Sequence, residues 1–404
     1  MKRKSSNFIA FDLGSSKILG LASHINNTGE IVVSAQSIYS SEGLKSGVVL
    51  NMELAENSII GALYALEKGC DKSIKHAAIS LSGAHVKSYY VSKSMPVNSK
   101  VVTSSDVKKL INKTLAEFNV SDKEIIHYFP IIFKINNNQI VDNPVDLYAR
   151  EISCQVHVVA AQSGLVMNLV KCFMKQHVDV NSIILGIYAS ALATLTENEL
   201  EIGSTIIDMG ANTTSYAIMS KGKLIYTNAI LIGGDDITLS IAKKLSISIK
   251  EAEKLKILYG NADPKLVAKD IIIDLNSESR STTSIEISKI ISPIIEDIFT
   301  QIKKQCQEMA VDSISAEQVV ITGGGAALAG IKRCASNIFQ KQIRIARAPA
   351  LEGFVEDYNP LSQSTLFGMA KFKLLSMQRS DPSHGLSEDI SFLKRVFIWI
   401  KNNI

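Results

Sequence analysis

The chain has 404 residues, of which 46% are apolar and 20% charged, and its net charge is +4 at pH 7. This length predicts more than one domain or a pair of large lobes. The small net charge gives no indication of a nucleic-acid-binding surface. Neither a signal core in the basic residues 1–7 nor an apolar run of about 18 residues is present, so we expect a cytoplasmic protein.

The cysteines indicate the same compartment. They are Cys70, Cys154, Cys172, Cys306 and Cys334. They are odd in number, scattered and without the spacing of metal ligands, so we expect ordinary buried thiols in a reducing environment.

One pattern occurs twice, at residues 7–17 and 204–214: an apolar strand ends in Asp-x-Gly, and small hydroxyl or amide residues follow. A second strand then turns back, with turns expected at 26–29 and 221–222. Backbone N–H groups of such a glycine-containing hairpin point together into an anion-binding concavity. One such loop is a weak signal. Two copies, 196 residues apart, predict two similar halves that grip one nucleotide.

The two loops supply the expected phosphate ligands, and the strand ends supply two carboxylates. The phosphate-binding residues would be Gly14, Ser15, Ser16, Lys17, Gly210, Ala211, Asn212 and Thr213. Asp12 and Asp208 are placed to hold a metal-bound water beside the phosphates. Lys17 directly follows Gly14, Ser15 and Ser16, which favours a role in neutralising phosphate charge; the alternative is a surface lysine at the start of a strand.

A third glycine cluster predicts the adenosine side of the site. The apolar strand 319–322 is interrupted by a turn of small residues that would let a flat ring approach the backbone. Helices are expected at 237–245 and 248–258, and the second would place two charged residues on one face. The expected adenosine-binding residues are Gly233, Gly234, Glu253, Lys256, Gly323, Gly324, Gly325 and Ala326. Taken alone, the turn could be an ordinary strand-to-helix connection, and the charged pair a solvated helix face.

Strands and helices alternate along most of the chain, which indicates α/β lobes. Segment 84–161 has its own βαβ-like rhythm and is expected to form a small inserted subdomain, with a helix that begins near Ser105. Segment 260–283 is polar and is expected to be irregular. The composition of 376–389 is typical of a flexible linker.

The last fifteen residues, 390–404, have an amphipathic pattern. On a helix, one broad apolar face would lie opposite a basic face, which is typical of a helix in the membrane interface. The membrane-contacting residues would be Phe392, Leu393, Lys394, Arg395, Val396, Phe397, Trp399, Ile400 and Lys401. The alternative is a helix docked on the protein's own core. Because few residues would be buried, stable attachment would need several copies in an assembly.

Together these motifs resemble the actin, Hsp70 and sugar-kinase superfamily, and within it the FtsA family of bacterial division proteins. The residues that carry the resemblance extend along the whole chain. They are Ser80–Gly83, Asn143–Leu147, Val156–Val159, Ala189–Leu192, Gly233–Thr238, Glu251–Gly260, Thr322–Gly325 and the C-terminal tail.

The resemblance implies an actin-like α/β fold with duplicated ribonuclease H-like cores around an ATP–Mg²⁺ cleft. It also implies that segment 84–161 serves contacts between protomers of a filament. The implied division is 1–83 with 162–195 and 349–375 in the first lobe, 196–234 and 306–348 in the second, 235–305 as its outer subdomain, 376–389 as linker and 390–404 as membrane helix.

The implied function is a polymerising membrane anchor of the division ring at the septum, on the inner face of the cytoplasmic membrane. Its partners would be the C-terminal tail of FtsZ, docked on 235–305, further copies of itself, an anionic membrane surface and later division proteins, with no nucleic acid. Two alternatives are an actin-like adaptor of type IV pilus assembly and a small-molecule kinase of the same superfamily.

The chain departs from the family pattern in two regions that bear on hydrolysis, the second loop with the residues after it and the stretch before Ala189. The second loop has Ala211 and Asn212 where many relatives have glycines, and Ser215 stands where an Asp often follows. Before Ala189 the chain has Gly-Ile-Tyr where hydrolysing relatives often carry Glu-Pro. We therefore expect slow ATP hydrolysis or none.

Overall fold

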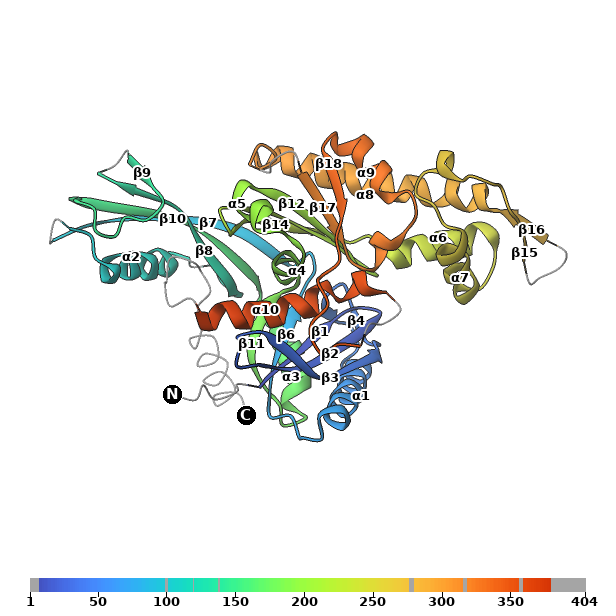
Figure 1. Cartoon of the computed structure of the whole chain (residues 1–404), viewed down its shortest axis with the longest axis horizontal. Coiled ribbons are helices and arrows are strands. Elements are labelled where there is room, and N and C mark those ends of the chain that lie inside the picture. Colours follow the sequence, from blue (N-terminus) through green and yellow to red (C-terminus); the bar gives the residue numbers. More distant parts are fainter. Residues whose placement is uncertain are drawn as a thin grey trace.

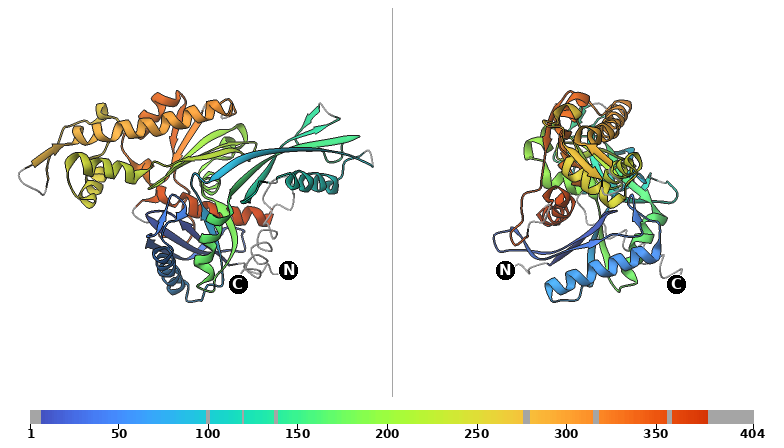
Figure 2. Two further views of the ribbon diagram at one scale, coloured as in Figure 1. Left: turned by 180° about the vertical axis from the view of Figure 1, so that it is seen from behind. Right: turned by 90° about the vertical axis from the view of Figure 1, so that its right-hand side faces the viewer.

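The computed structural model describes residues 7–98, 101–118, 120–136, 139–275, 280–314, 318–355 and 359–378. Two mixed sheets lie one above the other, and the long helix α10 (Ser364–Gln378) runs between them (Figure 1). Two smaller parts extend in opposite directions from this centre, as the view from behind also shows (Figure 2).

The first lobe is built on the sheet β11-β6-β1-β2-β3. Its strands are β1 (Phe8–Leu13), β2 (Lys17–Ile25), β3 (Ile31–Ser40), β6 (His76–Leu81) and β11 (Asp179–Leu185). The first three pair antiparallel, whereas β6 and β11 continue the sheet in parallel. The short strands β4 (Leu44–Lys45) and β5 (Val48–Val49) pair with each other.

The second lobe is built on the sheet β14-β13-β12-β17-β18. Its strands are β12 (Ser204–Met209), β13 (Thr214–Ser220), β14 (Lys223–Ile230), β17 (Gln318–Thr322) and β18 (Gln342–Ile345). Again the first three pair antiparallel and the last two pair in parallel. The two sheets therefore share one strand topology.

The register repeats as well. In the first hairpin the last pair is Leu13 with Ile18, and in the second it is Met209 with Thr214. Both hairpins thus turn through four residues, and Asp12 and Asp208 each take the place before the last pair. The duplication predicted from the sequence is confirmed at the level of hydrogen-bond register.

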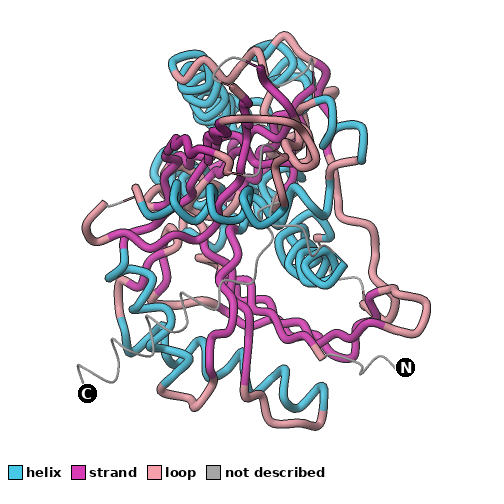
Figure 3. The backbone as a smooth tube through the Cα atoms, turned by 90° about the vertical axis from the view of Figure 1, so that its left-hand side faces the viewer, coloured by secondary structure: helices cyan, strands magenta, loops and turns pink. Residues whose placement is uncertain are grey.

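Helices cover both lobes. Those of the first lobe are α1 (Met52–Cys70), α3 (Ser163–Met174) and α4 (Gly186–Thr194). Those of the second lobe and its outer part are α5 (Glu197–Ile202), α6 (Gly234–Leu245), α7 (Ile249–Tyr259), α8 (Ser284–Glu308) and α9 (Ile331–Phe339). Figure 3 shows helices of the first lobe on the far side of its sheet from the second lobe. Among the described helices, none is both long and apolar enough to cross a membrane.

The inserted part forms its own four-stranded sheet, β7-β10-β8-β9, with α2 (Ser104–Ala116) packed on it. Its strands are β7 (Val86–Pro96), β8 (Lys123–Ile135), β9 (Gln139–Val141) and β10 (Glu151–Gln162). Because β10 pairs antiparallel with both β7 and β8, those two strands are parallel and the motif is a split βαβ unit. A separate apolar core fills the space under α2.

Three local expectations need correction. Helix α2 begins at Ser104, directly after Thr103. The hydroxyl and backbone of Thr103 form a capping box with Asp106, so Thr103 and not Ser105 is the N-cap. The sequence predicts a helix over 189–195, but helix α4 begins three residues earlier, at Gly186, and ends at Thr194. Segment 260–283 is not irregular throughout: it contains the 3₁₀ turn η1 (Pro264–Leu266) and the hairpin of β15 (Ile272–Leu275) and β16 (Arg280–Thr283).

Candidate nucleotide-binding site

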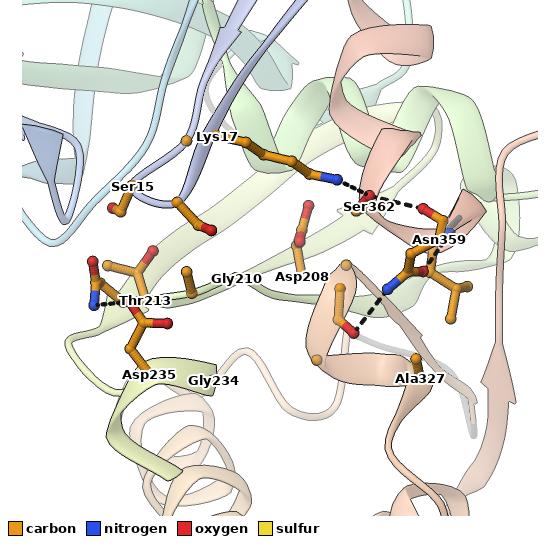
Figure 4. A pocket seen from close by; sticks show the side chains of 18 of the residues that line it. Ser15, Lys17, Asp208, Gly210, Thr213, Gly234, Asp235, Ala327, Asn359 and Ser362 are labelled. Carbon is orange, nitrogen blue, oxygen red and sulfur yellow. Dashed lines mark hydrogen bonds between the residues drawn. The ribbon is translucent and has the colours of Figure 1, made fainter. Parts of the chain in front are cut away.

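A cavity of about 830 Å³ lies between the lobes, and both Asp-x-Gly hairpins open into it. This volume is within the range of small-molecule and cofactor sites, about 300–1,000 Å³. Figure 4 shows Ser15 and Lys17 on one side of the space and Gly210, Asp208 and Thr213 on another. The cavity is thus walled by two loops that lie far apart in the sequence.

Glycine is required at the head of each loop because the chain doubles back closely. A Cβ atom at Gly14 would lie 2.6 Å from the Lys17 carbonyl oxygen, and one at Gly210 would lie 3.0 Å from that of Thr213. In the second loop the Gly210 N–H donates to the Thr213 carbonyl at 2.8 Å. That donor is therefore engaged in closing the turn, and a phosphate would have to be held by the N–H groups that follow it.

The Lys17 side chain points across the cavity. Its ammonium donates a 2.8 Å hydrogen bond to the hydroxyl of Ser362, which belongs to the 3₁₀ turn η3 (Pro360–Gln363) just before α10 (Figure 4). Ser362 Oγ in turn donates to the carbonyl of Asn359, and Asn359 Nδ2 reaches the carbonyl of Gly324. The ammonium is thus directed into the site and is held by a neutral partner.

The two carboxylates lie where the strands end, and each accepts a serine hydroxyl. Ser80 Oγ donates to Asp12 at 2.7 Å, and Ser190 Oγ donates to Asp208 at 2.6 Å. Burial raises the pKa of Asp12 to about 6, against the opposing effect of the Ser80 hydrogen bond, and the nearby Asp208 charge raises it further. Burial also raises the pKa of Asp208.

These two carboxylates fit a hard cation. Each is ionised only at a desolvation cost, and an oxygen-seeking divalent ion between or beside them would offset that cost. The described residues contain no group of three or more His, Cys, Asp or Glu side chains placed to hold a metal. Two carboxylates suit an ion such as Mg²⁺, which keeps several waters and takes its remaining ligands from phosphate oxygens.

The glycine turn after β17 forms the opposite wall. Gly323 has φ +88°, and a Cβ atom there would lie 2.3 Å from Asp208 Oδ1, so only glycine fits between this turn and the second hairpin. The 3₁₀ turn η2 (Gly324–Ala327) follows. Ile257, Leu258 and Leu328 supply apolar surface to the same cavity, which suits the face of a base.

Glu253 and Lys256 reach the cavity as a mutually satisfied pair. Lys256 Nζ lies 2.7 Å from Glu253 Oε2 and also donates to the Gly234 carbonyl and the Thr238 hydroxyl, at 3.0 and 2.8 Å. Glu253 also accepts from Thr238. This pair joins α6 to α7, and its charges are already compensated before a ligand binds.

The cavity brings together almost all the residues expected from the sequence. All eight loop residues, both aspartates, Gly234, Glu253, Lys256 and Gly323 to Gly325 line it. Gly233 and Ala326 are not among its lining residues. Gly233 instead packs against the Ala211 carbonyl, which a Cβ atom would approach to 2.4 Å, and Ala326 is buried below the turn.

Sequence reasoning missed the segment from Asn359 to Thr365, whose residues line the cavity from between the lobes. It also missed Asp235, which lies in the first turn of α6 beside the second loop and accepts from Asn212 Nδ2 at 2.9 Å. Burial raises the pKa of Asp235. The residues expected to contact a membrane, Phe392 to Lys401, lie outside the described residues.

Comparisons with known proteins agree with this geometry. The family model "Cell division protein FtsA" matches residues 205–363, "SHS2 domain inserted in FTSA" matches 83–160, and "Type IV pilus assembly protein PilM" matches 138–264. The cell division protein FtsA of Pseudomonas aeruginosa is 26% identical, over 98% of this chain and 97% of its own length. That of Borreliella burgdorferi is 29% identical over 90% of both chains.

Solved structures share the fold at lower identity. A PilM–PilN type IV pilus biogenesis complex superposes with a TM-score of 0.63 at 14% identity, covering 91% of this chain and 98% of that one. MreB5 of Spiroplasma citri bound to AMPPNP gives 0.54 at 16%, covering 93% and 98%. A MamK double helical filament gives 0.51 at 12%, covering 90% and 98%.

Two sheets of one topology around a glycine-walled cleft define an actin-like protein of mixed α/β fold. The match to the inserted SHS2 domain and the relatives that cover nearly the whole chain then identify the family within the actin-like proteins. The chain belongs to the FtsA family of cell division proteins.

Proposed function

We propose that this protein is an ATP-binding, polymerising membrane anchor of the division ring, tethering FtsZ to the inner face of the cytoplasmic membrane at the septum and recruiting later septal proteins. The observation that carries the proposal is the cavity between the lobes, into which Asp12, Lys17, Asp208 and the Gly323 turn all face. Membership in the FtsA family supports cell division as the process in which the protein acts.

ATP with Mg²⁺ is the proposed ligand. The phosphates would lie between the two hairpin loops, near Lys17 and the N-terminus of α6, where helix N–H groups and the helix dipole favour an anion. Asp12 and Asp208 would hold the water shell of the cation, and the apolar side chains around the glycine turn would contact the base. The AMPPNP-bound MreB5 structure supports a nucleotide in a cleft of this fold.

Hydrolysis is proposed to be slow or absent. The residues that line the cavity near the second aspartate are hydroxyls and amides, namely Asn212, Ser215 and Thr365, together with the apolar Ile187. Asp235, an acidic side chain beside this loop, accepts a hydrogen bond from Asn212 Nδ2. ATP would then act mainly by holding the lobes in one relative position, a population shift by differential affinity.

Polymerisation is proposed to use the inserted sheet as one contact surface. This sheet extends away from both lobes, so it is placed to reach a neighbouring protomer (Figure 1). The similarity to a filament-forming neighbour, the MamK double helical filament, supports a repeating assembly of this fold.

The FtsZ tail is proposed to dock on the outer part of the second lobe, residues 235–305. Outside the cavity, this part exposes large apolar side chains: Leu239, Ile249, Leu266, Ile271 and Ile272. Exposed apolar side chains of this kind suit a peptide partner. A labelled peptide with the sequence of the FtsZ C-terminal tail should bind the protein, and Ile249→Glu should weaken binding at least about tenfold.

The matched control for this test is Leu50→Glu, at an equally exposed apolar position of the first lobe. It should bind the peptide as the wild type does. Equal binding by both variants and the wild type would remove Ile249 from the docking surface, and no binding by the wild type would refute the proposed FtsZ contact.

The second candidate function is the pilus adaptor, favoured by the PilM family match to residues 138–264 and by the PilM–PilN superposition. The FtsA and SHS2 matches, and relatives that cover nearly the whole chain, favour division. Binding of the FtsZ tail separates the two, since a pilus adaptor has no reason to bind it.

A further inference from the structure

Helix α10 connects the cavity to the inserted sheet. It begins at Ser364, in the wall of the cavity, and runs toward the inserted part (Figure 1). Phe372, near the middle of the helix, packs against His127 of the inserted part. The fifteen residues of this α-helix span about 22 Å. One rigid element therefore links the cavity to the inserted sheet, although the two are formed largely by segments that lie far apart in the sequence.

The start of α10 contacts the groups that a nucleotide and its cation would need. Lys17 Nζ donates to Ser362, and Thr365 Oγ1 lies 2.9 Å from Ser190 Oγ and 3.4 Å from Asp208 Oδ2. A phosphate that takes the Lys17 ammonium and a cation that takes Asp208 would therefore both replace contacts made by this segment. With the site filled, Ser362 and Thr365 would therefore lose Lys17 and Asp208 as hydrogen-bond partners.

One side chain in the segment is poorly satisfied as it stands. Gln363 is 2% exposed, and its Nε2 has no hydrogen-bond partner among the described residues. A buried amide nitrogen without a partner is costly, and a small rearrangement that supplied an acceptor would lower the free energy. A ligand could therefore displace the residues at the start of α10 from their present positions at a small cost in free energy.

The middle of α10 belongs to a buried aromatic cluster formed by His127, Phe129, His157, Tyr188 and Phe372. Phe372 lies 5.6 Å from His127 and 6.2 Å from Tyr188, measured between ring centroids. Tyr188 lies 5.1 Å from Phe129, and Phe129 lies 6.0 Å from His157. His127 and Phe129 are on β8 and His157 is on β10, so three of the five rings belong to the inserted sheet.

The aromatic cluster also reaches the second lobe. His157 Nδ1 lies 2.7 Å from the Leu224 carbonyl of β14, and its Nε2 lies 2.8 Å from Ser88 Oγ. Close-packed side chains transmit a shift because they cannot compress. A movement of α10 along or about its axis must therefore be accommodated in the inserted sheet.

We propose that α10 couples occupancy of the cavity to the inserted sheet: nucleotide and cation withdraw Lys17 and Asp208 from the start of the helix, the segment closes on the ligand, and Phe372 passes the displacement to the aromatic cluster. This inference rests on the proposed nucleotide site. It makes the filament contact surface of the protein responsive to ATP through one helix.

Hydrogen exchange measured with and without ATP–Mg²⁺ tests the coupling. Peptides from 204–215 report occupancy of the cavity, and peptides from 123–135 and 151–162 report the inserted sheet. In the wild type, ATP–Mg²⁺ should slow exchange in both sets, in the inserted sheet by at least about twofold, since bound ligand suppresses local opening.

Two leucine substitutions in α10 provide the variant and its matched control. Phe372→Leu removes the ring that faces the inserted sheet. Phe367→Leu removes an equally buried ring of the same helix whose aromatic partner is Phe354, outside the inserted sheet. Both variants should bind ATP within about threefold of the wild type, but only Phe372→Leu should lose more than half of the slowing in the inserted sheet.

The outcomes separate this inference from the proposed function. If ATP–Mg²⁺ protects 204–215 but not the inserted sheet, or if the two variants behave alike, the coupling is refuted while the nucleotide site stands. If ATP–Mg²⁺ protects neither region of the wild type, the proposed nucleotide site is refuted and the coupling with it.

Discussion

The ammonium of Lys17 donates a 2.8 Å hydrogen bond to the hydroxyl of Ser362, a residue 345 positions further along the chain. Lys17 follows the first phosphate loop, and Ser362 precedes the last described helix. The contact therefore joins the beginning of the first lobe to the segment that returns between the lobes. A phosphate in the cavity would compete with the Ser362 hydroxyl for the Lys17 ammonium, because both would accept a hydrogen bond from it.

Replacing Ser362 by alanine should strengthen ATP binding. The variant leaves the Lys17 ammonium without its present partner, so a phosphate no longer has to displace that hydrogen bond. For a half-buried donor this is worth about 0.5–1 kcal/mol, or a two- to fivefold lower Kd. Isothermal titration with ATP–Mg²⁺ measures it.

The control is Ser376→Ala, because Ser376 donates only within α10, to the Lys373 carbonyl. Its Kd should equal that of the wild type. A Kd for Ser362→Ala that is higher than that of the wild type would mean that the hydroxyl binds the ligand directly, contrary to the competition described here.

Adding a carboxylate at Gly324 should block the phosphate and base side of the cavity. A Cβ atom at Gly324 would meet Asn359 and Ser362 only at 3.8 Å, which is ordinary contact, so the backbone has no need to move. Gly324→Asp should therefore fold, yet place a negative charge in the site and weaken ATP binding at least about tenfold.

Gly324→Ala supplies the same Cβ atom without the charge and should keep ATP affinity within about threefold. Retained affinity in Gly324→Asp would show that the nucleotide does not occupy this wall. Equal loss in both variants would point to a steric effect and would contradict the electrostatic explanation.

Replacing Asp12 by asparagine should stabilise the ligand-free protein above pH 6. Burial raises the pKa of this carboxyl to about 6, so the folded protein holds the proton more tightly than the unfolded chain does. Stability is consequently lost as the pH rises from about 4 through 6, and the full loss corresponds to about 1–3 kcal/mol at neutral pH. Asparagine avoids this cost and keeps an oxygen that accepts from Ser80.

Urea unfolding of the ligand-free protein at pH 7.5 and near pH 4 measures the difference, which should be present at the higher pH and absent at the lower. Asp179→Asn is the control, since that side chain is 74% exposed. A variant that is no more stable than the wild type at pH 7.5 would contradict the burial of an ionised Asp12.

Shortening His157 to alanine should loosen the contact between the inserted sheet and the second lobe. His157 is fully buried, and the change would leave both the Leu224 carbonyl and the Ser88 hydroxyl without the ring nitrogens that they contact. The lost packing and hydrogen bonds should lower the free energy of unfolding by about 2–4 kcal/mol. Thermal unfolding measures the effect.

His76→Ala is the matched control, because the His76 side chain is 63% exposed and contacts Asp179 only at 3.6 Å. Its stability should stay within about 0.5 kcal/mol of the wild type. If His157→Ala were equally harmless, the contact with β14 would not hold the inserted sheet in place.

Local sequence patterns predicted the parts of the fold that are encoded locally. The Asp-x-Gly hairpins were predicted because each is contiguous, with a turn such as Lys221–Gly222 where both residues have positive φ. Strand β11 and strand β18 were not predicted, because each is a short segment whose pairing partner lies far away in the sequence. The hairpin of β15 and β16 was missed because the four residues of β16, Arg280–Thr283, are all polar and show no alternation of apolar and polar side chains.

The candidate site divides in the same way. Its two loops and glycine turn carry a local signature, because close chain approach at Gly14 and Gly323 demands glycine. Residues 359–365 carry no such local signature. Their hydroxyls belong to the site only because the folded chain brings Ser362 to Lys17 and Thr365 to Asp208. The N-cap of α2 was placed two residues late because Thr103 and Ser105 are both acceptable caps, and only the capping box with Asp106 selects the first.

The central claim, an ATP-dependent polymer held on a membrane by its C-terminal segment, is tested most directly by co-sedimentation with anionic liposomes. The full-length protein would be compared, with and without ATP–Mg²⁺, with a chain that stops at Met377 and with a full-length variant in which Phe397 and Trp399 are replaced by Glu. We expect the wild type to pellet, more so with ATP–Mg²⁺, and both altered chains to stay in the supernatant while still binding ATP. Equal pelleting of all three, or of none under any condition, would contradict the membrane anchor.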